Sequence, residues 1–163
     1  MRLTQWTDYT IRVLMYCAAC RDRPQPVTIG EIAQSHRISR SHLTKVVQDL
    51  STKGWLDTTR GRGGGLRLAR AADEINLGDV VRSTETDFNL VECFDAEHNE
   101  CGLTPHCQLY GVIDRAMQSF FAELDRVTLA DLVPKGAACG MRASRTYPLV
   151  PGLPVRVGGK PGR

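Results

Sequence analysis

The sequence predicts a mainly α-helical fold with one small β-hairpin. Three observations support this prediction: apolar residues recur at helical spacing over residues 4–50, a glycine-rich turn separates two short alternating segments near residue 61, and a second helical pattern begins at residue 109. With 163 residues, 42% of them hydrophobic, the chain is long enough for one compact domain with accessory segments. We therefore expect a winged helix-turn-helix unit followed by a long helix.

Caps and breaks predict the first three helices. Thr4 is a suitable N-cap for an apolar helical pattern that stops at the charged, proline-containing residues 21–24. Thr28 can cap a short second helix that ends near His36, and Ser39 can cap a third after a three-residue turn. One face of the third helix is predicted to be buried, because its apolar residues stand at i, i+3, i+4 and i+7: Leu43, Val46, Val47 and Leu50. Two helices joined by a tight turn indicate a helix-turn-helix.

A β-hairpin is predicted directly after the third helix. Gly54 ends that helix, and residues 55–60 and 66–70 alternate around the glycine-rich residues 61–65, which is the pattern of a wing. The glycines do not indicate a phosphate-binding loop, because no Lys-Ser or Lys-Thr follows them and the next segment is a strand. Residues 75–81 are expected to form another short helix.

The chain divides into four predicted segments. Residues 1–85 form the winged helix-turn-helix domain, and residues 86–108 form a loop that contains three cysteines. Residues 109–133 form a long dimerisation helix, because an apolar stripe that long needs a partner and a second copy is the simplest one. Residues 134–163 are rich in glycine and proline and carry six bases and no acid, so we expect a disordered basic tail.

Basic residues gather where the helix-turn-helix and wing are predicted. Residues 37–70 hold eight bases against two acids, although the net charge of the whole chain is only +3. A basic island of this kind is typical of a surface that binds double-stranded DNA. The candidate DNA-binding residues lie at the start of the two helices and at the wing tip: Thr28, Ser39, Arg40, Ser41, His42, Lys45, Arg60 and Arg62.

Location and reaction class follow from what the sequence lacks. No apolar stretch is long enough for a membrane helix, and residues 13–20 make a poor signal peptide, so we expect no membrane partner and a cytoplasmic location. No catalytic signature is present, which predicts that the protein is not an enzyme.

The spacing Cys93-x7-Cys101-x5-Cys107 forms a candidate metal site. Three thiols in one polar loop suit an iron-sulfur cluster, but His98 or His106 could complete a structural zinc site instead. Metal-free redox thiols are a third interpretation. Ligand chemistry alone leaves these alternatives open.

The other three cysteines have simpler interpretations. Cys17 and Cys20 lie within an apolar helical pattern, where cysteine packs as a small hydrophobic residue. An oxidoreductase that uses this pair is the weakest alternative, and Cys139 is expected to be an ordinary exposed thiol.

The order of these parts resembles one family of regulators. The opening Thr7-Asp8-Tyr9, the Arg60-Gly-x-x-Gly-Gly wing and the Leu103-Thr-Pro-x-Cys107 stretch are together similar to nitric-oxide-sensing repressors of the NsrR type, which are related to IscR-type regulators. The resemblance covers residues 1–133. IscR-type members have a histidine three residues after the last loop cysteine, where this chain has Tyr110, so the resemblance favours the nitric-oxide branch.

This resemblance implies a cofactor, a fourth ligand and a signal. In NsrR-type proteins the three loop cysteines hold a 4Fe-4S cluster, and an aspartate from the other subunit of a homodimer completes the ligand set; by position that residue is Asp8. A 2Fe-2S cluster is the alternative, because the gap between the first two cysteines is longer than in the family. The implied function is a dimeric repressor that releases its DNA operator when nitric oxide reacts with the cluster. The alternatives are a regulator of iron-sulfur status or redox state with the same fold, and a zinc-binding protein-interaction module.

Overall fold

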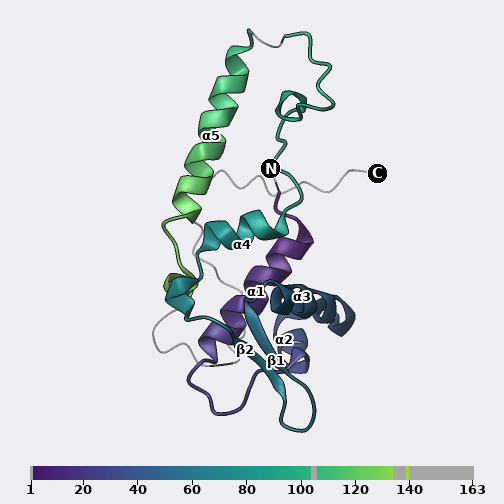
Figure 1. Ribbon diagram of the computed structural model, residues 1–163, viewed down its shortest axis with the longest axis vertical. Coiled ribbons are helices and arrows are strands. Elements are labelled where there is room, and N and C mark those ends of the chain that lie inside the picture. The colour runs from purple at the N-terminus through teal and green to yellow at the C-terminus, as the bar shows by residue number, and fades with distance from the viewer. Residues whose placement is uncertain (1, 104–105, 134–138, 140–163) are drawn as a thin grey trace, which may run out of the picture.

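The computed structural model describes residues 2–103, 106–133 and 139, and it consists of a packed head from which one long arm projects (Figure 1). We define the head as residues 2–85 with residues 127–133, and the arm as residues 86–126. In chain order the elements are α1 (Gln5–Ala19), α2 (Ile29–His36), α3 (Arg40–Thr52), β1 (Leu56–Thr59), β2 (Gly65–Leu68), the short 3-10 helix η1 (Ala72–Glu74), α4 (Leu77–Thr84), a second 3-10 helix η2 (Glu92–Phe94), α5 (Gln108–Leu124) and α6 (Leu129–Leu132). The mainly helical prediction with one hairpin is confirmed.

The predicted helix starts are confirmed. Thr4 accepts a hydrogen bond from the backbone N–H of Thr7 at 3.3 Å, and Ser39 accepts one from His42 at 3.3 Å. Thr28 and Glu31 form a reciprocal capping box at the start of α2. Each cap satisfies a backbone donor that would otherwise lack a partner, so the three helices begin where their cap residues stand.

The core of the head lies around α1. Leu14 of α1, Ile32 of α2, Leu43 of α3 and Ile75 before α4 are all fully buried. The expected packing role of Cys17 is confirmed, since its residue is only 3% exposed. Burial of its thiol raises the pKa of Cys17 to about 12, which keeps the thiol protonated and unreactive.

The tight turn between α2 and α3 contains a left-handed residue. Arg37 ends α2 with φ 56°, and the N–H of Ile38 bonds back to the carbonyl of Ala33 at 3.2 Å. This conformation reverses the chain in few residues, which sets α3 across α2 as a helix-turn-helix requires.

The wing is a two-stranded antiparallel hairpin. Leu56 pairs with Leu68 and Thr59 with Gly65, and an isolated bridge between Val27 and Leu66 ties the hairpin to the chain just before α2. Within the turn, Gly61 has φ 98°, a conformation that residues with a side chain rarely adopt.

The prediction of one continuous helix over residues 109–133 is wrong. α5 ends at Leu124, and a new helix starts at Thr128, whose N–H and hydroxyl both donate to Asp131 at 2.8 and 2.7 Å. The Thr-x-x-Asp sequence is a helix start signal that the apolar periodicity concealed. α6 returns to the head, where the N–H of Leu129 bonds to the carbonyl of Ile75 at 2.8 Å.

The prediction of an ordinary exposed thiol at Cys139 is also wrong, and Cys20 is buried as expected but is not simply a packing residue. The side chain of Cys139 is joined by a disulfide to Cys20, which lies at the C-terminal end of α1. The two residues are 119 positions apart in the sequence, so no local pattern predicts that they pair. The rest of the predicted tail lies outside the described residues.

The arm buries much less of its apolar surface than the head. Its long helix α5 has one buried residue, Met117. Large hydrophobic side chains that are exposed in the described part of the chain all lie on the arm: Leu90, Leu103, Leu109, Tyr110 and Val112. No helix among the described residues is long and apolar enough to cross a membrane.

Candidate functional site

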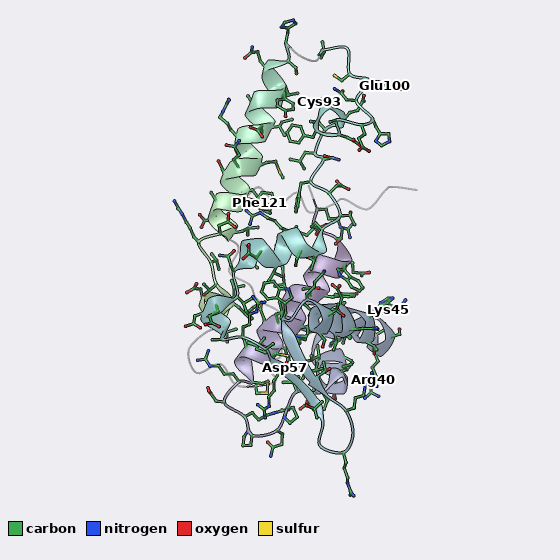
Figure 2. The ribbon with its side chains drawn as sticks, in the orientation of Figure 1. Arg40, Lys45, Asp57, Cys93, Glu100 and Phe121 are labelled. Atoms are coloured by element: carbon green, nitrogen blue, oxygen red, sulfur yellow. A yellow bond between two sulfur atoms is a disulfide. The ribbon has the colours of Figure 1, made fainter. Side chains whose placement is uncertain are left out.

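The predicted DNA-binding residues all lie at the surface of the head. Thr28, Ser39, Arg40, Ser41, His42, Lys45, Arg60 and Arg62 are each exposed. Figure 2 shows Arg40 and Lys45 on the same side of the head, while Cys93 lies toward the opposite end of the molecule. The buried face of α3 holds Leu43 and Leu50 in the core, so the polar face of the helix is turned outward.

The start of α3 is packed closely against the start of α2. A Cβ on Gly30 would lie 2.6 Å from Nη2 of Arg40, so the lack of a side chain on Gly30 leaves space for the Arg40 guanidinium. The centroid of the His42 ring is 6.3 Å from that of Tyr9 on α1. This predicted DNA-binding residue therefore lies beside α1. Lys45 lies one turn further along the same exposed face.

A groove of about 630 Å³ separates α3 from the wing. It is lined by hydroxyl and amide side chains that include Thr44 and Gln48 of α3 and Thr58 of β1, with Arg60 at the wing and Thr28 at the start of α2. Thr44, Gln48 and Thr58 were not among the predicted site residues. Thr44 and Gln48 could have been found from their polar positions one and two turns after Arg40 on the third helix, whereas Thr58 is on β1 and comes beside them only through the fold.

The three loop cysteines are free and half-buried on the arm. Cys93 lies in η2, Cys101 follows in the loop, and Cys107 occupies the N-cap position of α5, where its side chain makes no capping hydrogen bond. Within residues 2–103, 106–133 and 139, no three cysteine, histidine or acidic side chains are close enough together to hold a metal ion. The chemistry of three half-buried thiols suits an iron-sulfur cluster.

Two contacts on the arm bring the surroundings of these cysteines together. The ring of Phe94, next to Cys93, packs edge-to-face on Tyr110 of α5, with ring centroids 5.0 Å apart. Oε1 of Glu92 accepts a hydrogen bond from the N–H of Glu100 at 2.8 Å. Because Glu92 and Glu100 each precede a cysteine, this bond closes the long gap between Cys93 and Cys101 into a loop.

One of the two histidines considered as zinc ligands, His98, has another partner. Nδ1 of His98 lies 2.9 Å from Oδ2 of Asp95, within the loop that the Glu92–Glu100 bond closes. The hydrogen bond from His98 lowers the pKa of Asp95, which keeps this carboxyl ionised and the pair intact.

The predicted fourth ligand, Asp8, is not part of the arm. It lies in the first turn of α1, where its carboxylate binds Arg12 one helical turn later, with an Oδ2–Nη2 distance of 2.8 Å. Both side chains are 45% exposed, so Asp8 is accessible at the surface of this chain.

The arm is joined to the head by a polar and aromatic contact that the sequence did not predict. Nη1 and Nη2 of Arg82 on α4 each donate to one oxygen of Asp125 at 2.7 Å, and this hydrogen bonding lowers the pKa of Asp125. The Arg82 guanidinium also lies 4.5 Å from the ring centre of Phe121, and Asn76 donates to the carbonyl of Asp125 at 2.8 Å. We call this contact the arm joint.

A model of iron-dependent transcriptional regulators, the Rrf2 family, matches residues 3–135, which include the helix-turn-helix, the wing, the cysteine loop and α5. The chain belongs to the Rrf2 family. It is therefore a transcriptional regulator and not an enzyme, and such a regulator binds DNA.

Several Rrf2 relatives have a more specific name. The chain is 48% identical over 134 residues to the transcriptional regulator NsrR of Bacillus subtilis, a match that covers 82% of this chain and 90% of the relative. It is 45% identical over 138 residues to NsrR of Geobacillus kaustophilus, covering 85% of this chain and 93% of that one. The resemblance to NsrR-type proteins is thereby confirmed.

Solved structures of Rrf2-type regulators share the fold. A transcriptional regulator from Listeria innocua matches with a TM-score of 0.67 and 25% identity, covering 81% of this chain and 85% of that chain. CymR, the global cysteine regulator of Bacillus subtilis, matches with a TM-score of 0.63 and 25% identity, over 81% and 95% of the two chains. The Rrf2 match ends at residue 135, so Cys139 lies beyond it.

Proposed function

We propose that this chain is a homodimeric repressor whose binding to a palindromic operator depends on an iron-sulfur cluster that reacts with nitric oxide. The observation that carries this proposal is the presence, on one arm, of three free half-buried thiols beside an exposed apolar helix face. The similarity to NsrR proteins over most of the chain supports the same function.

Cys93, Cys101 and Cys107 are the proposed protein ligands, and a 4Fe-4S cluster is the proposed cofactor. The Phe94–Tyr110 packing and the Glu92–Glu100 hydrogen bond support this ligand set, because they restrict the loop segments that bear the cysteines. A bound cluster supplies iron, to which nitric oxide binds. Asp8 of a second copy is the proposed fourth ligand, and its carboxylate would hold iron less tightly than a thiolate because it is a harder ligand.

A second copy of the chain is the proposed partner of α5. Leu109 is 60% exposed and Val112 is 52% exposed, and these residues stand three apart on the helix, so they present one apolar face. Two such faces packed together would fix the distance between the two heads. That distance must be about 34 Å, or a multiple of it, for both α3 helices to enter successive major grooves.

Loss of the thiol ligands would relax the arm and so change the spacing of the heads. The arm joint supports this step, because Arg82 and Asp125 connect the base of α5 directly to α4 of the head. A coupling free energy of about 3 kcal/mol between the cluster site and the DNA site would weaken operator binding more than a hundredfold.

Anaerobic reconstitution with iron and sulfide tests the proposal. The operator is first selected from random duplex DNA with the reconstituted protein, and its affinity is then measured by fluorescence anisotropy before and after nitric oxide is added. We expect a visible absorption band, about four iron atoms per chain for a 4Fe-4S cluster, and a loss of affinity of about a hundredfold with nitric oxide.

Two variants make this experiment specific. Cys101→Ala is expected to lose the absorption band, whereas Cys17→Ala is expected to keep it, because Cys17 is a buried thiol of the core. A colourless protein with one zinc per chain would overturn the cofactor and support the zinc-binding module. An equal response to oxygen and nitric oxide would overturn the signal and support a general iron-sulfur or redox regulator.

The DNA interface has its own test. Lys45→Ala is expected to weaken binding of every duplex and to lower the slope of log affinity against log salt by about 1, which is the effect of one lost phosphate contact. Arg126→Ala is the charge-matched control, because its side chain is 79% exposed at the base of the arm, away from α3. An equal effect of both substitutions would contradict the assigned interface.

A further inference from the structure

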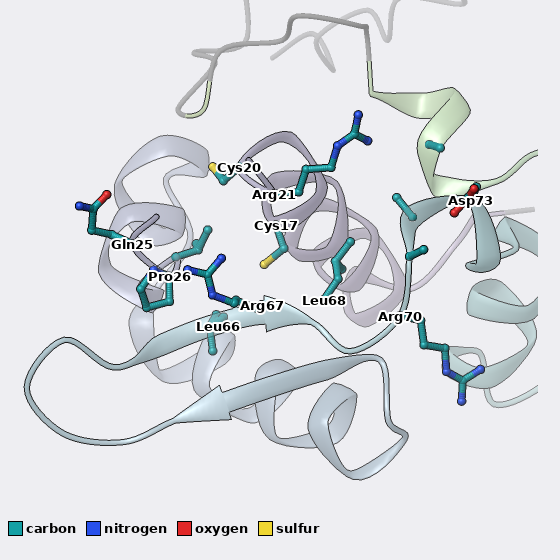
Figure 3. A pocket seen from close by; sticks show the side chains of 14 residues that line it. Cys17, Cys20, Arg21, Gln25, Pro26, Leu66, Arg67, Leu68, Arg70 and Asp73 are labelled. Atoms are coloured by element: carbon teal, nitrogen blue, oxygen red, sulfur yellow. The ribbon is translucent and has the colours of Figure 1, made fainter. Parts of the chain in front are cut away.

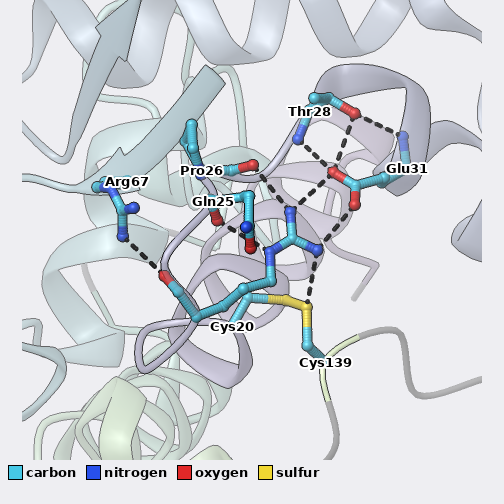
Figure 4. The surroundings of a disulfide bond; sticks show 8 residues. Cys20, Gln25, Pro26, Thr28, Glu31, Arg67 and Cys139 are labelled. Carbon is cyan, nitrogen blue, oxygen red and sulfur yellow. Dashed lines mark hydrogen bonds and ion pairs between the residues drawn. A yellow bond between two sulfur atoms is a disulfide. The ribbon is translucent and has the colours of Figure 1, made fainter. Parts of the chain in front are cut away.

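The Cys20–Cys139 disulfide joins the head to a part of the chain that the Rrf2 match does not include. Cys20 lies at the end of α1 and its residue is 4% exposed, while Cys139 is half-buried beyond α6 (Figure 4). The family match ends at residue 135, so Cys139 and the disulfide that it forms lie partly outside the matched residues. It is also separate from the three free cysteines of the arm.

A cation lies next to the disulfide. Nη1 of Arg23 donates a hydrogen bond to Sγ of Cys139 at 3.4 Å, and the same guanidinium binds both carboxylate oxygens of Glu31 at 2.8 and 3.1 Å. An arginine beside a sulfur atom favours the thiolate form after reduction, which makes that cysteine both a better leaving group and a competent nucleophile. Cys139 is therefore the reactive partner of the pair.

Cys17 provides an internal contrast. It lies one turn before Cys20 and lines the same pocket of about 520 Å³ between α1 and the wing (Figure 3). Burial alone raises the pKa of the Cys17 thiol to about 12, and no cation contributes to this shift. Two cysteines of one helix thus differ in chemistry because only Cys20 has a partner beside an arginine.

The arginine next to the disulfide also contacts the helix-turn-helix, because Arg23 binds Glu31 of α2. Glu31 accepts hydrogen bonds from the N–H of Thr28 at 2.7 Å and from its hydroxyl at 3.0 Å, which completes the capping box of α2. The hydrogen bond from Arg23 lowers the pKa of Glu31 to about 2. The Arg23 guanidinium therefore contacts both the Cys139 sulfur and Glu31, which is part of the capping box of α2.

We propose that Cys20 and Cys139 are a reversible thiol–disulfide site that responds to low-molecular-weight disulfides and controls how tightly the head binds DNA. In the oxidising direction, the Cys139 thiolate attacks a small disulfide and releases one small thiol, and the Cys20 thiolate then displaces the second. The two protein thiols lose two electrons to the small disulfide, and their two protons appear on the two small thiols released.

The link changes DNA affinity through charge as well as through the cap of α2. The chain after Cys139 holds five bases and no acid: Arg142, Arg145, Arg156, Lys160 and Arg163. Arg142 follows Cys139 by three positions in the sequence, so the disulfide attaches the beginning of this basic sequence covalently to the head. Oxidation therefore anchors the start of a basic segment to the DNA-binding head, which raises its effective concentration near a duplex bound there.

Thiol trapping tests the redox site directly. The full chain is equilibrated anaerobically in mixtures of reduced and oxidised glutathione, alkylated, and analysed by peptide mass spectrometry. We expect Cys20 and Cys139 to change together from linked to alkylated as the ratio changes, and Cys20→Ser to leave Cys139 alkylated or bound to glutathione. A pair that stays linked at every ratio, or that never links, overturns the proposal.

DNA binding tests the consequence. Anisotropy with a random-sequence 40-base-pair duplex is measured for the metal-free full chain in the oxidised and reduced forms. We expect oxidation to tighten binding about fivefold at low salt and to steepen the salt dependence by about one phosphate contact. Cys139→Ser should remove this difference and Cys17→Ala should retain it. Equal affinities of the two forms of the unaltered chain overturn the control of DNA binding.

A second variant guards against misfolding of Cys139→Ser. The double substitution Arg142→Ser and Arg145→Ser leaves both cysteines in place, so it is expected to form the disulfide but to show a smaller gain in affinity on oxidation. The melting temperature of the unaltered chain should rise by at least about 5 °C on oxidation, because the link closes a long loop. A full gain in affinity with the double variant would contradict the role of the basic segment.

Discussion

The head and the arm of this protein differ in how completely each is folded by its own contacts. In the head, the starts of α1, α2, α3 and α4 each have a side-chain cap, and the core residues Leu14 and Leu43 are fully buried. In the arm, α5 begins at an uncapped Cys107 and buries only Met117. The comparison teaches that caps and a buried core hold the head together, whereas few contacts within the described chain hold the arm.

The largest effect should come from a core substitution in the head. Leu43→Ala is expected to lower the free energy of unfolding by about 3 kcal/mol, because Leu43 is fully buried and its removal leaves a cavity. Val112→Ala on the arm should change it by less than about 0.5 kcal/mol at low protein concentration. Urea denaturation of the metal-free protein measures both, and similar losses for the two variants would refute the contrast between the regions.

Acidic pH should also destabilise the head. Burial lowers the pKa of His36 from 6.5, and the nearby positive charge of Arg12 lowers it further, so the unfolded chain takes up a proton before the folded chain does. Stability is therefore lost as the pH falls from 6.5 through the folded pKa, with a slope of at most about 1.4 kcal/mol per pH unit from this group. Denaturation at a series of pH values should show a smaller slope for His36→Gln.

The capping positions of the two regions should respond in opposite directions. Thr28→Ala removes a capping hydrogen bond from α2 and is expected to cost about 1 kcal/mol. Cys107→Ser places a good capping residue at the start of α5 and should stabilise the metal-free arm by about 0.5 kcal/mol, although it removes a proposed ligand. Amide hydrogen exchange in the first turn of each helix measures the two effects. Faster exchange in α5 of Cys107→Ser would show that the cysteine already stabilises this helix.

The smallest effect is expected at the arm joint. Asp125→Asn weakens an ion pair whose side chains are 41% and 43% exposed, so solvent screens the pair and the loss of stability should be close to the error of a urea denaturation experiment. Amide exchange should nevertheless become faster in the last turn of α5 and stay unchanged in α3. Arg126→Gln is the matched control at the neighbouring position, and an equal change in both variants would assign the effect to surface charge in general.

Local sequence signals predicted most of the head. Thr4, Thr28 and Ser39 each announced a helix start, because a cap acts on backbone groups two or three residues away. Thr128 and Asp131 form the same kind of signal at the start of α6. It is hidden because apolar residues continue at helical spacing across the break between α5 and α6. Where a signal is local, the sequence contains enough information to place the element.

Pairings between distant residues could not be predicted in this way. Arg82 and Asp125 are 43 positions apart, and Cys20 and Cys139 are 119 apart, so neither pair leaves a periodic trace in the sequence. The three loop cysteines were recognisable because they share one segment, yet their ligand roles and the role of Asp8 remain predictions. Arg82 meets Asp125, and Cys20 meets Cys139, only after the chain has folded, so local patterns cannot predict these contacts.

The rigidity of α5 has a mechanical consequence for the arm joint. A helix of 17 residues is about 26 Å long, so it acts as a lever with Cys107 at one end and Phe121 near the other. A sideways shift of about 2 Å at Cys107 becomes a tilt of about 5° at the base, where Asp125 holds Arg82 of α4. A small displacement of the cysteine sulfurs would thereby rotate α5 relative to α4 of the head while the Arg82–Asp125 contact is kept.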